Sequence, residues 1–293
     1  ISEYAMCKIC KSIYRITNLK EEDEQLLYSK NKYKPAKGGL IYNHLKKMNA
    51  YYEKYSILKH ILNNKSKIKN TVLDIGCGKG YLLETFAKNN KYICYGIDLN
   101  IQNDRHNIQF IMASFKNLDN IKKINADIII INNFIEHIEN MQDLFNIINT
   151  MKKGSYMIII TPDTNSKARL FFGNCWSGYH APRHKVLFNK NNILDLFSNI
   201  KNINLKTYKI YDPFTNIISL SNLIKEVFNH FHLRILIKII RFPIILLLDL
   251  VNKNRILLII KKNRANYLIS FIIALFPLIH FKRPQNAPKD ITV

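Results

Sequence analysis

The feature that most constrains this chain is a glycine-rich turn, VLDIGCGKG, at residues 72–80. A short apolar run ends around Asp74, and Gly76, Gly78 and Gly80 follow at alternate positions. Glycine lets the backbone turn sharply and lets a ligand approach closely, because it has no Cβ. Apolar residues at helical spacing come next, so the order is strand, glycine turn and helix. That order predicts the ligand-binding start of a doubly wound α/β domain.

Asp74 distinguishes between the kinds of ligand that such a turn can bind. A dinucleotide would place a pyrophosphate over the turn, and a carboxylate there would repel it. The spacing Asp-x-Gly-x-Gly-x-Gly resembles motif I of the class I S-adenosylmethionine-dependent methyltransferases, whose cofactor carries an attractive ammonium and sulfonium. The alternatives are a nicotinamide-dependent oxidoreductase, which predicts a Gly-x-Gly-x-x-Gly turn instead, and a chance glycine turn with an inward-facing Asp.

Later segments resemble further motifs of the same family. An apolar run ends at Asp98, which the resemblance assigns to the ribose hydroxyls, with Leu99 beside the adenine. Ser114 stands where the family usually has an acid for the adenine amino group, so this contact lacks charge assistance. Asn132 ends a run of isoleucines that suits a strand buried on both faces. By resemblance, the cofactor-binding residues are Asp74, Gly76, Cys77, Gly78, Gly80, Asp98, Leu99, Ser114 and Asn132.

An acid–histidine pair follows this strand. Glu136 and His137 match the corresponding pair of the ubiquinone-biosynthesis O-methyltransferases and their relatives. Methyl transfer to an oxygen needs a base near neutral pH, and we predict His137 in that role, with Glu136 orienting a histidine. Asn133 stands where an acid helps to hold a metal in some relatives, which argues against metal use here. The structural alternative is a histidine packed at the start of a helix.

A second candidate segment covers residues 171–188. It resembles the Trp-x-Gly…Pro-x-His…Phe segment of the same subfamily. His180 and His184 are the further catalytic candidates in it. Because substrate contacts concentrate on loops of a rigid scaffold, we interpret this loop as a wall of the acceptor site. The alternative is a structural loop held by Trp176.

The N-terminal segment carries a possible metal pair, Cys7 and Cys10. Many methyltransferases of this type begin with a four-cysteine zinc ribbon, and residues 1–34 resemble its second half. Since a tetrahedral zinc site needs four ligands, we expect another Cys-x-x-Cys upstream in a longer chain. The resemblance implies a structural zinc ion at Cys7 and Cys10, and the alternative is a pair of surface cysteines.

Beyond this segment we expect a cofactor-binding domain at residues 35–215 and a hydrophobic helical segment at 216–287. Residues 288–293 would begin the last strand, with residues 255–260 as a less favoured alternative. The predicted fold is α/β: a doubly wound, mostly parallel, seven-stranded sheet with helices on both faces. The last strand is antiparallel by family analogy, whereas alternating strand and helix patterns independently predict parallel pairing.

Residues 229–281 mix basic side chains with apolar runs. No run reaches the ~20 apolar residues of a membrane-spanning helix. Basic residues such as Lys238, Arg241 and the cluster at 255–264 would suit a hairpin lying on an anionic membrane surface. The alternative is a helical lid packed on the sheet or on a second subunit.

The net charge of +23 would suit nucleic acid or anionic lipid. However, Lys, Ile and Asn are abundant together, which indicates background codon usage, and no nucleic-acid motif is recognisable. Five cysteines scattered through an α/β chain argue for a reducing compartment. We therefore expect a cytoplasmic protein that contacts the inner face of the membrane.

The sequence thus predicts a methyltransferase that uses S-adenosylmethionine and acts on a small-molecule, glycan or lipid-like acceptor by in-line transfer. No specific nucleic-acid partner is expected. The competing hypothesis is a non-catalytic, membrane-associated protein that retains the fold. Ser114 and Asn133 leave room for that hypothesis, whereas the glycine turn argues against it.

Overall fold

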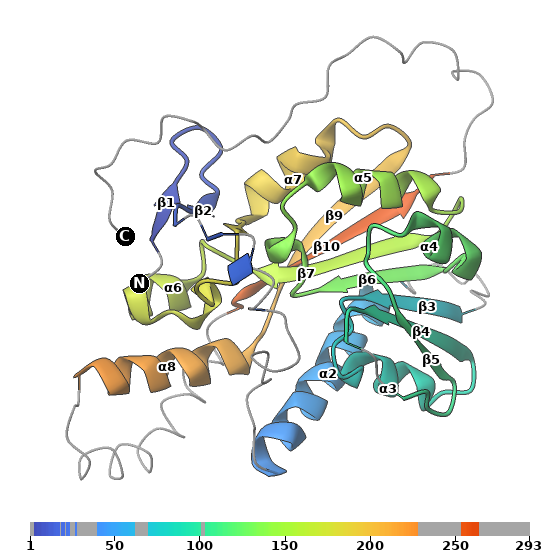
Figure 1. Cartoon of the computed structure of the whole chain (residues 1–293), viewed down its shortest axis with the longest axis horizontal. Coiled ribbons are helices and arrows are strands. Elements are labelled where there is room, and N and C mark those ends of the chain that lie inside the picture. Colours follow the sequence, from blue (N-terminus) through green and yellow to red (C-terminus); the bar gives the residue numbers. More distant parts are fainter. Residues whose placement is uncertain are drawn as a thin grey trace.

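The computed structural model describes residues 3–17, 19–20, 22–23, 27, 40–61, 70–100, 103–227 and 253–263. A seven-stranded sheet forms the centre of this part of the chain (Figure 1). In spatial order its strands are β5 (Ile108–Met112), β4 (Tyr92–Asp98), β3 (Asn70–Ile75), β6 (Ile128–Asn132), β7 (Tyr156–Pro162), β10 (Arg255–Lys262) and β9 (Ile203–Ile210). The strands from β5 to β7 pair in parallel, and β10 is antiparallel to both β7 and β9. The predicted α/β fold is therefore confirmed.

The antiparallel strand is the less favoured of the two alternatives. β10 covers the 255–260 run and lies between β7 and β9, in register with both. The preference for residues 288–293 in this position was therefore wrong, and those residues lie outside the described part of the chain. The physical reason is burial on both faces, because a nearly continuous aliphatic run suits an interior strand better than a short polar one. The expectation of a helical segment over 216–287 is also corrected here, because residues 255–262 within it form the strand β10.

Helices cover both faces of the sheet, as Figure 1 shows. Alternating side chains of each central strand enter opposite hydrophobic clusters, because successive strand residues point to opposite faces. In β6, Ile129 and Ile131 pack toward one set of helices, whereas Ile128 and Ile130 pack toward the other. The first set is α4 (Leu118–Ile124), α5 (Met141–Thr150) and α7 (Lys190–Ser198), and the second is α2 (Leu40–Ile61) and α3 (Tyr81–Ala87).

A smaller unit adjoins the end of β7. It contains a three-stranded antiparallel sheet of β1 (Tyr4–Met6), β2 (Ile13–Arg15) and β8 (Val186–Leu187). Its short helical segments are α6 (Lys167–Phe172), η2 (Gly173–Cys175) and η3 (Ser177–Tyr179). A third hydrophobic cluster joins these elements, and α8 (Pro213–Val227) packs against it. The N-terminal hairpin is therefore bound to the 171–188 loop.

Trp176 lies at the centre of this third cluster and is fully buried. Its ring packs against Gly178 so closely that a Cβ there would lie 2.2 Å from it. Tyr179 packs edge-on against the same ring. Trp176 is thus part of the core, which favours the structural interpretation of this part of the loop.

Among the described residues, no helix combines the length and the apolar character that crossing a bilayer would require. Of the 229–281 segment, only residues 253–263 are described, so the membrane-surface hypothesis falls mainly on residues outside the described structure. The structure corrects the expected position of one basic residue of this segment, however. Arg255 is 1% exposed, so it belongs to the interior and not to a surface basic cluster.

Candidate active site

The glycine turn and Asp98 form one structural unit, which we call the cofactor cradle (residues 74–80 and Asp98). Gly76, Gly78 and Gly80 have φ values of 73°, 52° and 72°, in the left-handed region that favours glycine. The Gly76 amide donates to the carbonyl of Ile97 at 2.8 Å. A Cβ on Gly76 would lie 2.3 Å from the Phe134 ring. The turn therefore requires glycine here both for its conformation and for space.

Asp98 holds the cradle from the adjacent strand. Its Oδ2 accepts a hydrogen bond from the Gly78 amide at 2.9 Å, and its Oδ1 accepts one from the Asn100 amide at 2.9 Å. Each carboxylate oxygen can accept more than one hydrogen bond, so the group can still bind hydroxyls. Leu99, next along the chain, is 61% exposed and could cover an aromatic ring. The geometry is compatible with both predicted roles, which remain predictions.

Asp74 is the first residue of the cradle, and 3% of its surface is exposed. Among the described residues, no donor reaches its Oδ1. Burial, with smaller contributions from the charges of Glu53 and Asp98, raises the pKa of Asp74 well above its usual value. A buried carboxyl group with an unsatisfied oxygen and two nearby acids indicates a site that a cation would stabilise.

The other predicted cofactor residues differ in how they are oriented. The Cys77 thiol packs over Gly96 on β4, and burial raises its pKa, so it stays neutral. Ser114 is exposed just beyond β5, where its Oγ accepts from the Lys116 amide at 3.3 Å. Asn132 ends β6 and donates from Nδ2 to Glu53 Oε2 at 2.9 Å.

A second group of side chains, which we call the histidine cluster, contains Glu136, His137, His180 and His184. Glu136 and His137 lie on η1 (Ile135–His137), directly after β6. The His137 and His184 rings are 4.8 Å apart between centroids, and the His180 and His184 rings are 5.0 Å apart. The structure therefore brings together all four predicted catalytic residues.

Backbone carbonyls fix the tautomers of two of these rings. His137 Nδ1 lies 3.1 Å from the Arg183 carbonyl, and His184 Nδ1 lies 2.8 Å from the Gly178 carbonyl. Because a carbonyl only accepts, both Nδ1 atoms carry the proton, and each neutral ring has its lone pair on Nε2. His184 is buried, whereas His137 is partly exposed and His180 is exposed. An acceptor could thus reach His137 or His180 more easily than His184.

Burial controls protonation in the cluster. It lowers the pKa of His137 to about 4, against a smaller opposing effect of its hydrogen bond to Arg183. It also lowers the pKa of His184 well below the usual range. Burial raises the pKa of Glu136 to about 7. Near neutral pH both rings are uncharged, so the 3.8 Å approach of His184 Nε2 to Glu136 Oε1 is not an ion pair.

Three members of the histidine cluster form the one group of three metal-capable side chains in the described part of the chain. The potential ligand atoms of Glu136, His137 and His184 lie within 4.8 Å of one another. Glu136 Oε1 has no hydrogen-bond partner among the described residues, while its Oε2 accepts from Thr161 at 3.1 Å. Asn133 does not extend this group, because its Oδ1 accepts from Arg255 at 3.0 Å instead.

Cys7 and Cys10 lie in the turn between β1 and β2, where the Cys7 amide donates to the Ser12 carbonyl at 2.9 Å. Both thiols are free and partly exposed. No other cysteine, histidine or acid joins them in a three-residue group within the described structure. The zinc site therefore remains a prediction.

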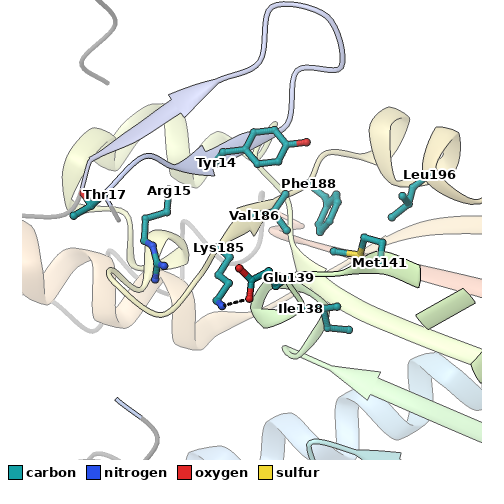
Figure 2. Close-up of a pocket in the computed structure, with 10 residues that line it drawn as sticks. All are labelled: Tyr14, Arg15, Thr17, Ile138, Glu139, Met141, Lys185, Val186, Phe188 and Leu196. Atoms are coloured by element: carbon teal, nitrogen blue, oxygen red, sulfur yellow. Dashed lines mark hydrogen bonds and ion pairs between the residues drawn. The ribbon is translucent and has the colours of Figure 1, made fainter. Parts of the chain in front are cut away.

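A cavity of about 280 Å³ lies between the N-terminal hairpin and the segment after η1. Figure 2 shows Lys185 paired with Glu139, with the nitrogen and oxygen 3.1 Å apart, near the Arg15 side chain. The other lining residues are Tyr14, Thr17, Ile138, Met141, Val186, Phe188 and Leu196. The 171–188 loop thus contributes to a cavity that adjoins the histidine cluster along the chain.

Sequence reasoning missed two members of the site, Glu53 on α2 and Arg255 on β10. They form a buried ion pair that contacts Asn132. The only signal in the sequence was a basic residue at the head of an aliphatic run. That signal does not identify the partner, which lies 202 residues away.

Comparisons with known proteins agree with this geometry. The family model described as a methyltransferase domain matches residues 46–231. The plantazolicin methyltransferase BpumL in complex with SAH aligns with a TM-score of 0.51 and 16% identity, covering 83% of this chain and 96% of that one. Its complex with a monoazolic desmethylPZN analog and SAH gives 0.52 and 16%, covering 76% and 87%. At these identities the likeness shows the fold. No curated protein matches the sequence.

Proposed function

Because the chain belongs to the methyltransferase-domain family, we propose that it transfers a methyl group from S-adenosylmethionine to an acceptor. The observation that carries the proposal is the buried carboxyl group of Asp74 beneath the glycine turn, with one unsatisfied oxygen. Glu53 and Asp98 are the neighbouring acids that raise its pKa. An acidic cradle attracts the sulfonium and ammonium of S-adenosylmethionine, whereas it repels the pyrophosphate of a dinucleotide. The SAH-bound neighbours support the same cofactor.

The chemistry is an in-line displacement at the methyl carbon. The new bond forms between the acceptor atom and this carbon while the carbon–sulfur bond breaks, and the electron pair stays on sulfur, which becomes a neutral thioether. The cofactor is already activated, so the protein mainly aligns the reactants. With a hydroxyl acceptor, the proton goes to His137 Nε2, which carries the lone pair of the neutral ring. Glu136, ionised above about pH 7, would stabilise the imidazolium.

The acceptor we propose is a small molecule, a glycan or a lipid-like compound. A cavity lined by apolar side chains together with Arg15 and Lys185 supports an acceptor that is partly apolar. The competing hypothesis is a non-catalytic protein that retains the fold. The intact cradle argues against it, since such a protein needs no buried carboxyl group beneath the turn.

Titration calorimetry tests the cofactor. We expect binding of S-adenosylmethionine and of S-adenosylhomocysteine, and no binding of NAD at the same concentration. The absence of binding for both sulfur compounds would favour the non-catalytic hypothesis. With labelled cofactor and a cell extract as acceptor source, His137→Ala should lose transfer but keep cofactor binding. His106→Ala, at an exposed histidine after β4, is the matched control and should keep both.

We also propose contact with an anionic membrane surface. It is supported by Leu170 and Phe171 on α6, which are 74% and 63% exposed, and by the adjacent α8, which precedes the mixed basic and apolar residues 229–252 in the sequence. Exposed apolar side chains gain by insertion between headgroups. The protein should float with anionic vesicles at low salt, and the double variant Leu170→Ser/Phe171→Ser should float less. Met48→Ser, an exposed apolar position on α2, is the control. Equal flotation of all three would reject this surface.

A structural zinc ion at Cys7 and Cys10 is a further proposal. The Cys-x-x-Cys spacing on a hairpin turn supports it, and four ligands would require a second pair. Metal analysis of a chain extended upstream by some tens of residues should find one zinc ion per chain. A longer chain without zinc would reject it.

A further inference from the structure

Arg255 is the centre of a buried polar network that joins four parts of the chain. It begins β10, and only 1% of it is exposed. Its guanidinium donates to Glu53 on α2, to Asn132 at the end of β6, and to Asn133 Oδ1 at 3.0 Å. Asp212, just before α8, places Oδ2 3.8 Å from Arg255 Nε. A planar guanidinium suits this role because it presents several donors in a fixed geometry.

The network determines how the Asn132 side chain points. A guanidinium can only donate, so the atom facing Arg255 must be Asn132 Oδ1. The carboxylate of Glu53 accepts from Asn132 Nδ2 at 2.9 Å. Glu53 and Arg255 are themselves paired, so the three side chains close a ring of contacts. The amide therefore has one orientation, set by residues on α2 and β10.

Arg255 also holds the turn that follows β6. Asn133 has a φ of 50°, a left-handed conformation that asparagine adopts more readily than most other residues with a side chain. Two contacts hold it there: its amide donates to the Ile160 carbonyl at 2.8 Å, and its side chain accepts from Arg255. The next residue is Phe134, whose ring packs on Gly76 of the cofactor cradle. His137 lies at the end of the same short segment.

We propose that Arg255 is a positioning residue for methyl transfer. By holding Asn132 and Asn133, it sets the segment that covers Gly76 on one side and carries His137 on the other. This inference rests on the proposed function for its reaction, but the geometric role of Arg255 stands on the network alone. Glu53 and Asp212 compensate the charge of Arg255. The hydrogen bonds to the two asparagines depend in addition on the planar geometry of the guanidinium.

The first test measures affinity for S-adenosylhomocysteine by calorimetry in four proteins: wild type, Arg255→Met, Asn132→Ala and the double variant. Loss of charged hydrogen bonds of this kind should weaken binding about tenfold in Arg255→Met. Because Arg255 acts through Asn132, the double variant should be no weaker than the weaker single variant. Arg169→Met is the control: Arg169 bonds Tyr179 and Thr164 outside the network, so affinity should stay within about twofold of wild type. If the losses of affinity in the two single variants multiply in the double variant, the proposal is overturned. Full affinity in folded Arg255→Met would overturn it as well.

The second test does not need the cofactor. Imidazole ¹H–¹⁵N spectra of the unliganded protein should show a shifted His137 resonance in the Arg255 variant and an unshifted resonance for His106. If Arg255→Met does not fold, Arg255→Lys carries both tests, since it keeps the charge but loses the planar fork. A wild-type protein that binds no S-adenosylhomocysteine would refute the proposed function, while the His137 spectrum would still decide the positioning role. An unmoved His137 resonance would overturn that role.

Discussion

The cofactor cradle and the histidine cluster lie at neighbouring strand ends but are built in different ways. The cradle is local: residues 74–80 and Asp98 come from two adjacent parallel strands, and backbone conformation holds them. The histidine cluster brings residues of η1 together with a loop that follows α6, and it consists of titratable side chains whose burial controls their protonation. This difference predicts that substitutions at the glycines of the cradle change stability through shape, independently of pH. Substitutions in the histidine cluster should change stability through charge, and therefore with pH.

The largest expected effect tests the shape of the cradle. In Gly76→Ala, the new Cβ meets the Phe134 ring at 2.3 Å and the residue keeps a φ of 73°. Overpacking and left-handed strain together should lower the free energy of unfolding by about 4 kcal/mol. Denaturant unfolding at pH 6 and pH 8 should give the same loss at both values.

Gly78→Ala is the matched control, because a Cβ there meets no described atom within 4 Å. Only the left-handed strain applies, so the loss should be about 1–2 kcal/mol. Equal losses in the two variants would show that the Phe134 contact does not contribute to the loss, and the steric explanation of the cradle would be wrong.

The next effect tests the charge in the histidine cluster. Burial raises the pKa of Glu136 to about 7 from an ordinary value of 4.5. Between these values the folded state binds more protons than the unfolded state, so this group lowers stability as pH rises. Gln cannot ionise. At pH 8 Glu136→Gln should therefore be more stable than wild type by about 3 kcal/mol, and the difference should shrink toward pH 5.

The buried histidines titrate in both proteins, so their contribution cancels in this difference. Urea unfolding from pH 5 to pH 8 measures it. Glu139→Gln is the control, because the Glu139 side chain is 80% exposed, and this substitution should change the free energy of unfolding by less than about 1 kcal/mol. A constant difference for Glu136→Gln would mean that the carboxyl group stays ionised, contrary to the charge-based description of the cluster.

The same contrast explains how far the sequence could be interpreted. The cradle could be predicted because strand, turn and acid are consecutive in the sequence, and each glycine has a local conformational reason. The run of isoleucines correctly indicated a strand buried on both faces. Arg255 could not be predicted, because its hydrogen-bond partners lie 122–202 positions away in the sequence and its charge resembled a surface charge. The 171–188 loop was interpreted as a substrate wall, and the burial of Trp176 within it could not be predicted for a similar reason, because it packs in one cluster with residues of the N-terminal hairpin.

A smaller effect concerns Asp98, where shape and charge meet. Its carboxylate accepts from the Gly78 amide and is predicted to bind the ribose hydroxyls. Asp98→Ala should weaken binding of S-adenosylmethionine by about 2 kcal/mol, since it leaves hydroxyls unpaired and removes a charged acceptor. Calorimetry measures this loss, and Asp104→Ala, at an acid whose carboxylate accepts from the Phe110 amide, is the control. Unchanged affinity in Asp98→Ala would remove Asp98 from the cofactor site.

The smallest expected effect concerns Ser114 and tests whether an added charge there increases affinity for the cofactor. Ser114 is exposed at the end of β5, at the position where the family resemblance expects an acid for the adenine amino group. In Ser114→Asp, a charged acceptor replaces a neutral one, so affinity for S-adenosylmethionine should rise by about 0.5–1 kcal/mol. Ser114→Asn offers a neutral acceptor of similar size and should leave affinity nearly unchanged. Added salt should reduce the gain in the Asp variant, because an exposed charge is screened. If Ser114→Asp binds no more tightly than Ser114→Asn in titration calorimetry, the adenine does not contact this position, and affinity on this side depends on the backbone-held cradle and Asp98.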